Sequence, residues 1–299
     1  MTGKGFGYAY TNTRVRVMKS KLIDPTDYPK LMKMSLDQIA RYLQETEYKK
    51  EIDLMGATYS GVDLIEYSLN RNLANSFKKI LDFSLKDSKE SINLYLKKYD
   101  LWNIKTILRG KQSNESNKEI IDDLIPAGEF TEAFLIEVIK KSNSVEEAIE
   151  FFKKTSYYEI LKKYSKNLSE LEDELDINYY SELIQKSEGK AKDLFQEQAI
   201  QLDALNSARA KETKIEMKRI FSAKKKTKIK VEDIHKSRIE FKQNLAVKGR
   251  KLLHEFKRKS SPVIGYFIAK ENEINNLRII SRGKHSGLPE ELIEQQMVF

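Results

Sequence analysis

The chain has 299 residues, of which 40% are hydrophobic and 33% charged, with only 5 prolines and 12 glycines. This composition provides a core and few chain breakers, so it favours an all-α fold. The absence of cysteine excludes disulfides and thiolate chemistry and fits a reducing compartment. The longest apolar runs fall far short of the ~20 residues of a membrane-spanning helix, so neither a membrane span nor a secretory segment is expected.

The net charge of +9 is concentrated in three basic runs, although Lys and Arg elsewhere alternate with Asp and Glu. The runs are residues 14–21, 224–230 and 248–259. A basic patch of this kind binds nucleic acid, an acidic protein face or anionic lipid. The two later runs are poor in the aromatic residues that stack on bases, so nucleic acid is the least expected of these partners.

The N-terminal segment predicts a first helix. Val15, Met18 and Leu22 share one helical face, and Arg14 and Lys21 lie on the other. Tyr8 and Tyr10 are expected to precede this helix as an aromatic staple, and Asp24-Pro25 is expected to stop it or start the next one.

Helical patterns continue along the rest of the chain. Residues 29–54 predict two helices, and residues 62–83 predict one long helix. The later expected elements are a helix at 91–109 carrying Trp102, further helices through 192–259, a helix with an N-cap at Ser261-Pro262, and a short helix after Leu288-Pro289.

The rest of the chain is organised around the stretch Ile268–Lys284. Ile274, Leu277 and Ile280 form an apolar stripe, and Gly283 is expected to be the C-cap of the helix. Arg282 and Lys284 flank this glycine. They fit two roles, which are capping of the negative helix end and contact with a partner.

Two segments of the chain recur. Residues 101–111 align without a gap with residues 274–284, and residues 35–48 align with 144–157 at an offset of 109. A weaker third copy at 202–211 keeps the Asp-x-x-Asn spacing as Asp203 and Asn206. We therefore predict three similar helical lobes at residues 1–112, 113–213 and 214–299, the last of them shorter by about thirty residues.

No catalytic motif is present. The sequence has neither a phosphate-binding loop nor a dinucleotide fingerprint nor a His-Glu-x-x-His motif, and its three histidines lack metal-ligand spacing. Helix packing accounts for most of the pattern, so a structural or coupling protein without a cofactor is expected.

Four segments carry a resemblance to a known family. Residues 8–18, 67–73 and 273–284, together with Gly287-Leu288-Pro289, resemble the C subunit of the archaeal and bacterial A-type/V-type ATP synthases. Its eukaryotic relative is the d subunit of the V-ATPase. The resemblance covers both ends and most of the middle of the chain.

The resemblance implies an all-helical funnel of three similar lobes that performs no chemistry. It implies a single-copy socket between the proteolipid rotor ring and the D-type and F-type central-stalk subunits, peripheral on the cytoplasmic face of the membrane and held there by its partners. Ion flow through such a complex drives ATP synthesis, or ATP hydrolysis drives ion pumping. This chain departs from the family around residues 211–230, where it is abbreviated.

The candidate partner contacts are basic residues of the N-terminal segment and of the two copies of the recurring Arg-Gly-Lys: Arg14, Arg16, Lys19, Arg109, Lys111, Arg282 and Lys284. Exposed charge pairs are worth only ~0–1 kcal/mol each, which suits a grip that can be released. The alternative function is a helical-repeat module that binds RNA or another acidic partner, and its affinity would fall steeply with salt. An enzyme ranks third, after the socket and the binding module.

Overall fold

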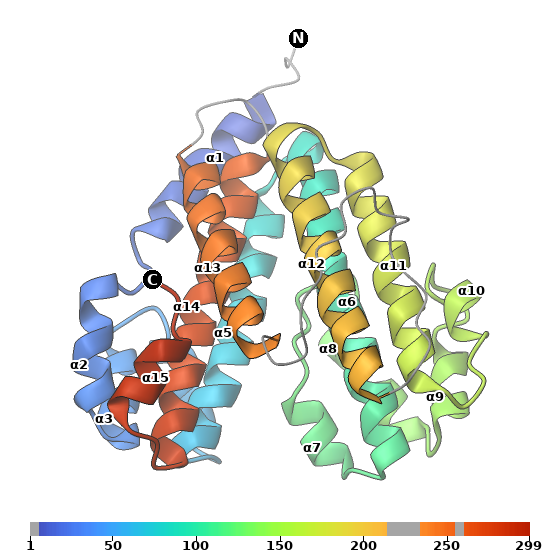
Figure 1. The fold of residues 1–299 in the computed structure, drawn as a ribbon, viewed down its shortest axis with the longest axis horizontal. Helices are drawn as coiled ribbons and strands as arrows, with labels where there is room; N and C mark the ends of the chain where they lie inside the picture. Colours follow the sequence, from blue (N-terminus) through green and yellow to red (C-terminus); the bar gives the residue numbers. More distant parts are fainter. Residues whose placement is uncertain (1–5, 214–233, 255–259) are drawn as a thin grey trace. The chain divides into compact units, whose positions relative to one another are not determined.

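The computed structural model describes residues 6–213, 234–254 and 260–299. Within these ranges every regular element is a helix (Figure 1), which confirms the all-α prediction. The described helices include none that is long and apolar enough to cross a bilayer. The chain divides into two compact units, and each is described by itself.

Unit 1 comprises residues 1–92 and 239–299. Its elements are α1 (Phe6–Lys19), the 3-10 helix η1 (Pro25–Asp27), α2 (Tyr28–Lys33), α3 (Leu36–Gln44), α4 (Lys49–Met55), α5 (Gly61–Phe83), α14 (Ser261–His285) and α15 (Glu290–Gln296). It also holds most of α13 (Ile234–Leu253) and the start of α6 (Lys86–Ser113).

Unit 2 comprises residues 93–238. Its elements are the remainder of α6, α7 (Asn117–Asp122), α8 (Glu132–Lys141), α9 (Val145–Phe151), α10 (Tyr158–Leu161), α11 (Leu168–Lys186), α12 (Gly189–Thr213) and the described start of α13.

The core of unit 1 surrounds α14. This helix packs against α1, α2, α3, α5 and α15, so residues from both ends of the sequence build one core (Figure 1). The rings of Phe77 on α5 and Phe267 on α14 lie 4.4 Å apart, and neither side chain is exposed. The strong burial of α14 explains why an apolar stripe alone does not describe it.

Two glycines bring α13 and α14 together. A Cβ atom on Gly265 would lie 2.6 Å from the backbone nitrogen of Leu253 and 2.7 Å from the carbonyl oxygen of Gly249. Such distances leave no room for any side chain. The backbones of the two helices therefore meet at this point, as small residues allow.

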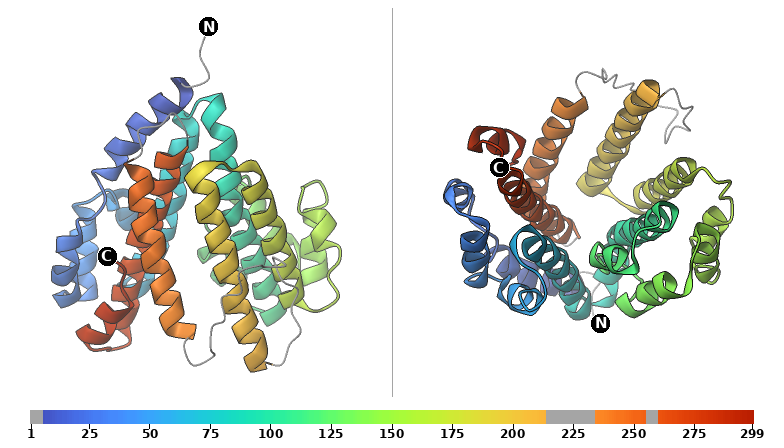
Figure 2. Two further views of the ribbon diagram at one scale, coloured as in Figure 1. Left: turned by 45° about the horizontal axis from the view of Figure 1, so that its top comes forward. Right: turned by 90° about the horizontal axis from the view of Figure 1, so that it is seen from below.

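The core of unit 2 surrounds α6. The hydroxyl of Tyr179 on α11 donates to the backbone oxygen of Tyr95 at 3.0 Å, and the rings of Tyr95 and Phe195, on α12, lie 5.9 Å apart. α11 and α12 also pack along each other, as both views of Figure 2 show. These long helices give unit 2 a stiff frame.

The structure corrects three local predictions. Tyr8 and Tyr10 lie inside α1 instead of preceding it. Residues 29–54 contain three helices, because Ser35 caps α3 and a turn at 45–48 separates α3 from α4. Ser261 is the first residue of α14, not its N-cap.

Other predictions are confirmed or stay open. The long helix expected at 62–83 is α5, and the short terminal helix is α15. The division into three lobes and the funnel stay predictions. The segment expected to be abbreviated lies mostly at 214–233, outside the described residues.

Candidate functional site: the motifs of the long helices

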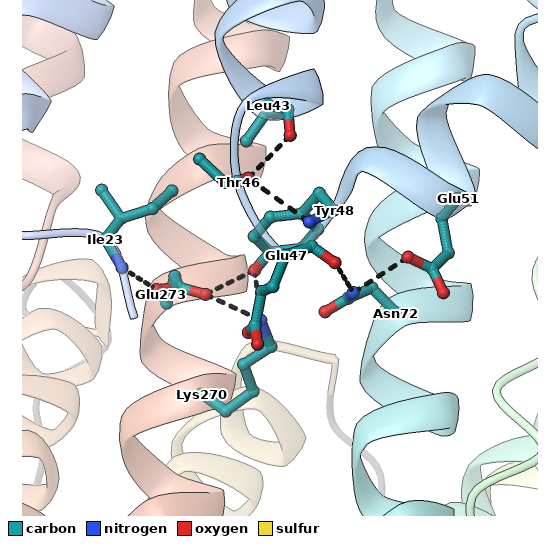
Figure 3. Close-up of polar contacts among 9 residues, drawn as sticks. All are labelled: Ile23, Leu43, Thr46, Glu47, Tyr48, Glu51, Asn72, Lys270 and Glu273. Atoms are coloured by element: carbon teal, nitrogen blue, oxygen red, sulfur yellow. Dashed lines mark hydrogen bonds and ion pairs between the residues drawn. The ribbon is translucent and has the colours of Figure 1, made fainter. Parts of the chain in front are cut away.

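A buried polar cluster links α14 to the N-terminal part of unit 1 (Figure 3). The Glu273 carboxylate accepts hydrogen bonds from the Tyr48 hydroxyl at 2.6 Å and from the backbone N–H of Ile23. The Lys270 ammonium lies 2.8 Å from Glu273 and also pairs with Glu47. It sits 4.0 Å from the centre of the Tyr48 ring.

This cluster sets one ammonium against two carboxylates at a largely buried site. Lys270 is 0% exposed and Glu273 is 3% exposed, so each charge depends on its partners for the solvation that water no longer provides. Burial and the nearby Glu273 raise the pKa of Tyr48 well above its usual value. Tyr48 therefore remains a protonated hydrogen-bond donor, and the cluster links α14 permanently to the N-terminal part of unit 1.

The turn at Thr46 positions Tyr48. The Thr46 hydroxyl donates to the Leu43 carbonyl at 2.7 Å and accepts from the backbone N–H of Tyr48 at 3.3 Å (Figure 3). The Asn72 amide, on α5, donates to the Glu47 carbonyl at 3.0 Å. The recurring segments 35–48 and 144–157 both end in Thr-x-Tyr, and here this end is a turn that presents a tyrosine to an acid on the long helix.

A similar cluster lies in unit 2. The Asp100 carboxylate, on α6, accepts from the backbone N–H groups of Glu129 and Phe130 at 3.0 Å each. It also accepts from the Tyr157 hydroxyl at 3.2 Å. Thr155 holds Tyr157 as Thr46 holds Tyr48, with a bond of 3.3 Å from the tyrosine N–H.

The two long helices also carry equivalent asparagines. Asn103 exchanges two hydrogen bonds of 2.8 Å with the backbone of Ile125. Asn276 does the same with Val298, 22 residues further along in both cases, at 2.7 and 3.0 Å. The candidate third copy differs, because Asn206 donates to the side chain of Asp173 at 3.4 Å.

Gly283 does not cap α14, contrary to the prediction, and the aligned Gly110 does not cap α6. Gly110 is followed by three further residues of α6, and Gly283 by two of α14. A Cβ atom would lie 2.5 Å from Ile120 Cγ1 at Gly110 and 2.6 Å from Ile293 Cγ1 at Gly283. Both glycines therefore admit a buried isoleucine of the following short helix.

Replacing Gly283 with alanine is expected to destabilise unit 1 by about 1–3 kcal/mol, because overpacking outweighs the better helix propensity of alanine. Urea unfolding measures the change. A double-mutant cycle uses Ile293→Ala, which removes the contacting Cγ1 atom. The double variant is expected to lose less stability than the sum of the losses of the two single variants. Additive losses would contradict the contact.

The predicted contact residues Arg109 and Arg282 make equivalent ion pairs within their own units. Arg282 binds Glu66 of α5 with two hydrogen bonds, of 2.6 and 3.1 Å. Arg109 binds Glu172 of α11 with two hydrogen bonds, and this pairing raises the arginine pKa. Both arginines remain accessible, with the side chains of Arg282 and Arg109 66% and 60% exposed.

The two lysines of the motif lie differently. Lys111 donates to the Ile139 carbonyl in the last turn of α8 at 2.6 Å and to Asn117 at 3.0 Å, so it caps a neighbouring helix. Burial lowers the pKa of Lys111. Lys284 lies 3.5 Å from Glu290 at the start of α15.

The N-terminal candidates lie along α1. The Arg14 guanidinium donates to the Tyr10 hydroxyl at 2.8 Å and lies 4.6 Å from the centre of the Phe83 ring. Lys19 lies 3.2 Å from the His254 imidazole, and Arg16 is partly buried on the same helix. The structure thus brings the three N-terminal candidates onto one helix, whereas Arg282 and Lys284 belong to another.

The chemistry available at these sites is limited. Among the described residues, no group of three His, Cys, Asp or Glu side chains is arranged to hold a metal ion. The buried acids Glu273 and Asp100 each already accept two or more hydrogen bonds. Sequence analysis missed Lys270, although the aligned Lys97-x-x-Asp100 and Lys270-x-x-Glu273 patterns signalled a lysine one turn before each acid.

Two aspartates in unit 2 predict a pH dependence of stability. Burial raises the pKa of Asp100 to about 6, and burial and nearby Asp176 raise the pKa of Asp173 to about 6, from 3.8. At a pH between 3.8, the pKa of an ordinary aspartate, and about 6, the folded chain binds more protons than the unfolded chain. The free energy of unfolding therefore rises as pH falls from 6 to 4. Urea unfolding at several pH values measures this slope.

Asp173→Asn serves as the control for this prediction, because it removes one of the two titrating groups while leaving an oxygen for Asn206. The variant is expected to be more stable than the wild type at pH 7 and to show a shallower slope. A free energy of unfolding that stays constant or decreases as the pH falls from 6 to 4 would contradict the prediction.

Comparison with known proteins decides the family. A family model described as "ATP synthase (C/AC39) subunit" matches residues 11–209 and 198–296. The chain belongs to this family.

Curated relatives of this C/AC39 chain are similar over nearly their whole length. The C subunit of the A-type ATP synthase of Methanosarcina mazei is 36% identical, with 97% of this chain and 92% of the relative aligned. The corresponding protein of Archaeoglobus fulgidus is 32% identical, with 99% and 97% aligned. That of Haloferax volcanii is 31% identical, with 99% of each aligned.

The alignments also show a difference in length. The alignment with the Methanosarcina mazei protein runs over 346 positions, whereas this chain has 299 residues. The relative therefore carries residues that have no counterpart here. The C/AC39 family is confirmed, and the location of the shorter segment stays a prediction.

Proposed function

We propose that this C/AC39 chain is the non-catalytic central-stalk socket of a proton- or sodium-translocating A/V-type ATP synthase. It couples the proteolipid rotor ring to the D-type and F-type stalk subunits, so that ion flow drives ATP synthesis or ATP hydrolysis drives pumping. One copy sits peripherally on the cytoplasmic face of the membrane, held by its partners. The observation that carries this proposal is the near full-length similarity to the C subunits of A-type ATP synthases.

The internal structure of the two units suits a part that transmits force. In each unit an acid on the long helix binds a tyrosine from a Thr-x-Tyr turn, and an asparagine binds the backbone of a following segment. Buried contacts with several partners are lost together, so they resist local opening more than exposed pairs do. A helix held in this way moves with its unit.

We propose that the seven basic candidate residues bind acidic groups of the partner subunits. Arg109 and Arg282 keep more than half of their side chains exposed while paired within the chain. Their pairing with Glu172 and Glu66 fixes the guanidinium groups, which lowers the entropy lost when a further acid binds. The other proposed contributors are Arg14, Arg16, Lys19, Lys111 and Lys284.

The experiment that tests the function is capture of the tagged chain from detergent-solubilised membranes of its own source, with bound proteins identified by mass spectrometry. Recovery of proteolipid and central-stalk subunits is the expected result. Recovery of only nucleic acid or unrelated soluble proteins would contradict it.

Charge reversal tests the proposed basic contacts in the same assay. The double variant Arg14→Glu/Lys19→Glu is expected to recover several-fold less of the partner subunits, because close like charges across an interface cost several kcal/mol. Lys78→Glu/Lys79→Glu on the exposed side of α5 is the matched control, with two reversed charges in the same unit. Equal recovery by both double variants and the wild type would exclude a contact role for α1.

A further inference from the structure

Unit 1 contains a pocket of about 340 Å³. It is lined by the end of α1 and the turn that follows, by α13 and α14, and by the segment after α15. Its buried residues include Ile23, Tyr28, Leu253 and Val298. Pockets that bind small molecules have volumes of roughly 300–1,000 Å³ and mostly apolar walls, so this pocket is large enough for a ligand.

The buried polar side chains of the pocket already have partners within the chain. Glu273 accepts a hydrogen bond from the backbone N–H of Ile23. Asn276 exchanges two hydrogen bonds with the backbone of Val298, and Asn272 donates to the same residue at 2.9 Å. A polar ligand group placed among them would leave water without gaining a hydrogen bond. The deep part of the pocket therefore favours an apolar ligand group.

An aromatic ring at the edge of the pocket adds apolar surface. The ring of Phe299 lies edge-on to that of Tyr28, with centres 5.8 Å apart, and Phe299 remains 42% exposed. The Arg250 guanidinium donates to the backbone oxygen of Phe299 at 2.7 Å and holds this residue in place. A hydrocarbon group in the pocket would remove apolar surface of Phe299 from water, which is favourable.

The rim of the pocket carries a cation without an acid. The Lys19 ammonium lies 3.2 Å from Nε2 of His254, and no carboxylate of residues 6–213, 234–254 or 260–299 pairs with it. Asp24, an exposed acid of the rim, instead accepts hydrogen bonds from the backbone and the hydroxyl of Thr26 as the N-cap of η1. An anion beside Lys19 would accept strong hydrogen bonds from the remaining N–H groups of the ammonium.

We propose that this pocket binds an anionic amphiphile, with its hydrocarbon chain among the apolar residues and its phosphate or carboxylate head beside Lys19. A neutral hydrocarbon leaves Lys19 without an anion, and a free phosphate leaves the apolar surface in water, so the site matches a ligand with both parts. Membrane phospholipids and soluble fatty acids share this chemistry. The ammonium has three N–H groups, so a head group and an acid of a partner subunit can both bind Lys19.

The test is titration calorimetry of the purified chain with dodecyl phosphate below its micelle concentration. Dodecyl maltoside carries the same hydrocarbon chain on a neutral head, and inorganic phosphate carries the head alone. One dodecyl phosphate is expected to bind per chain, about tenfold more tightly than either comparison ligand. Equal affinities for dodecyl phosphate and dodecyl maltoside, or no binding of either, would overturn the inference.

Two variants assign the binding to the pocket. Ala269→Phe fills the pocket from α14 and should abolish binding, and circular dichroism checks that the variant is folded. Lys19→Gln removes the ammonium and should lower the affinity for dodecyl phosphate to that for dodecyl maltoside. Lys21→Gln is the matched control, because Lys21 is exposed two residues further along and does not line the pocket. Wild-type affinity in either folded test variant would contradict the proposed site.

Mass spectrometry of the chain released from its native membranes distinguishes the two sources of ligand. A bound phospholipid is expected, and this expectation rests on the proposed function, which places the chain at a membrane. A bound fatty acid would support the pocket and assign a soluble source, whereas a chain that carries neither would overturn the inference. Calorimetry uses the chain alone, so failure to capture ring or stalk subunits contradicts the proposed function without affecting this result.

Discussion

Replacing Lys270 with methionine is expected to destabilise unit 1 by about 3–5 kcal/mol, because breaking a buried ion pair leaves its carboxylates uncompensated. Lys270 is 0% exposed and pairs with both Glu47 and Glu273. Equilibrium unfolding by urea, followed by circular dichroism, measures the loss.

Lys97→Met is the matched control for this prediction. Lys97 occupies the aligned position on α6, but its side chain is 25% exposed and it pairs with Glu182, which is 24% exposed. Water reaches this pair more than it reaches Lys270, so the loss is expected to be smaller than that of Lys270→Met. Equal losses in the two variants would show that burial of Lys270 does not set the stability of the cluster. The double variant Lys270→Met/Glu273→Gln is expected to regain part of the loss, since one uncompensated charge is removed.

The second large effect is expected for Asn103→Leu, which keeps the volume of the side chain but removes both hydrogen bonds to Ile125. The buried N–H of Ile125 then loses its partner, whereas the Ile125 carbonyl keeps the hydrogen bond from the Ala127 N–H. An unsatisfied buried N–H costs about 1–3 kcal/mol and the lost hydrogen bond to the carbonyl about 1 kcal/mol, so we expect a loss of about 2–4 kcal/mol from urea unfolding. Asn276→Leu should show a loss of the same size.

Asn206→Leu separates the third candidate copy from the other two. Asn206 makes one long bond to a side chain, at 3.4 Å, and no bond to a following backbone segment is seen in the described part of the chain. Its replacement is expected to cost less than about 1 kcal/mol, within the range of ordinary hydrogen bonds. A loss as large as that of Asn103→Leu would mean that all three copies have the same structural role, and would contradict the expected difference.

The sequence identified the right residues in the repeats without their roles. Asp100, Asn103 and Gly110 recur as Glu273, Asn276 and Gly283, and each pair has one structural role. Gly283 was misassigned because a glycine near a helix end is compatible with both a cap and a close packing contact. Only the position of Ile120 and Ile293 decides between these two roles, and this position depends on the turn that follows.

The basic candidates show a second limit. Lys and Arg are visible in a sequence, but the acids that meet them lie far along the chain, as Glu66 does for Arg282. A single sequence does not reveal such pairs, so exposed partner contacts and internal ion pairs look alike.

The amphipathic pattern predicted the long helix α5 well because α14, α4, α3 and α1 cover its apolar residues and leave residues such as Lys78 and Lys79 exposed. It described α14 less completely, since residues on nearly all sides of that helix are buried. The hydrogen bonds and ion pairs of Lys270, Glu273 and Asn276 lie within this buried surface. Buried polar residues interrupt an apolar stripe and are therefore interpreted as solvent-facing in a sequence.

The measurement that tests the coupling role most directly uses the complete complex in sealed vesicles, prepared with and without this chain. Without the chain, the subunits of the complex that hydrolyse ATP are expected to remain active while ion uptake into the vesicles is lost. Adding the purified chain should restore ion uptake. Ion uptake that proceeds at the normal rate without the chain would contradict the account. So would loss of ATP hydrolysis by the separated head, because that result would assign the chain to the catalytic reaction.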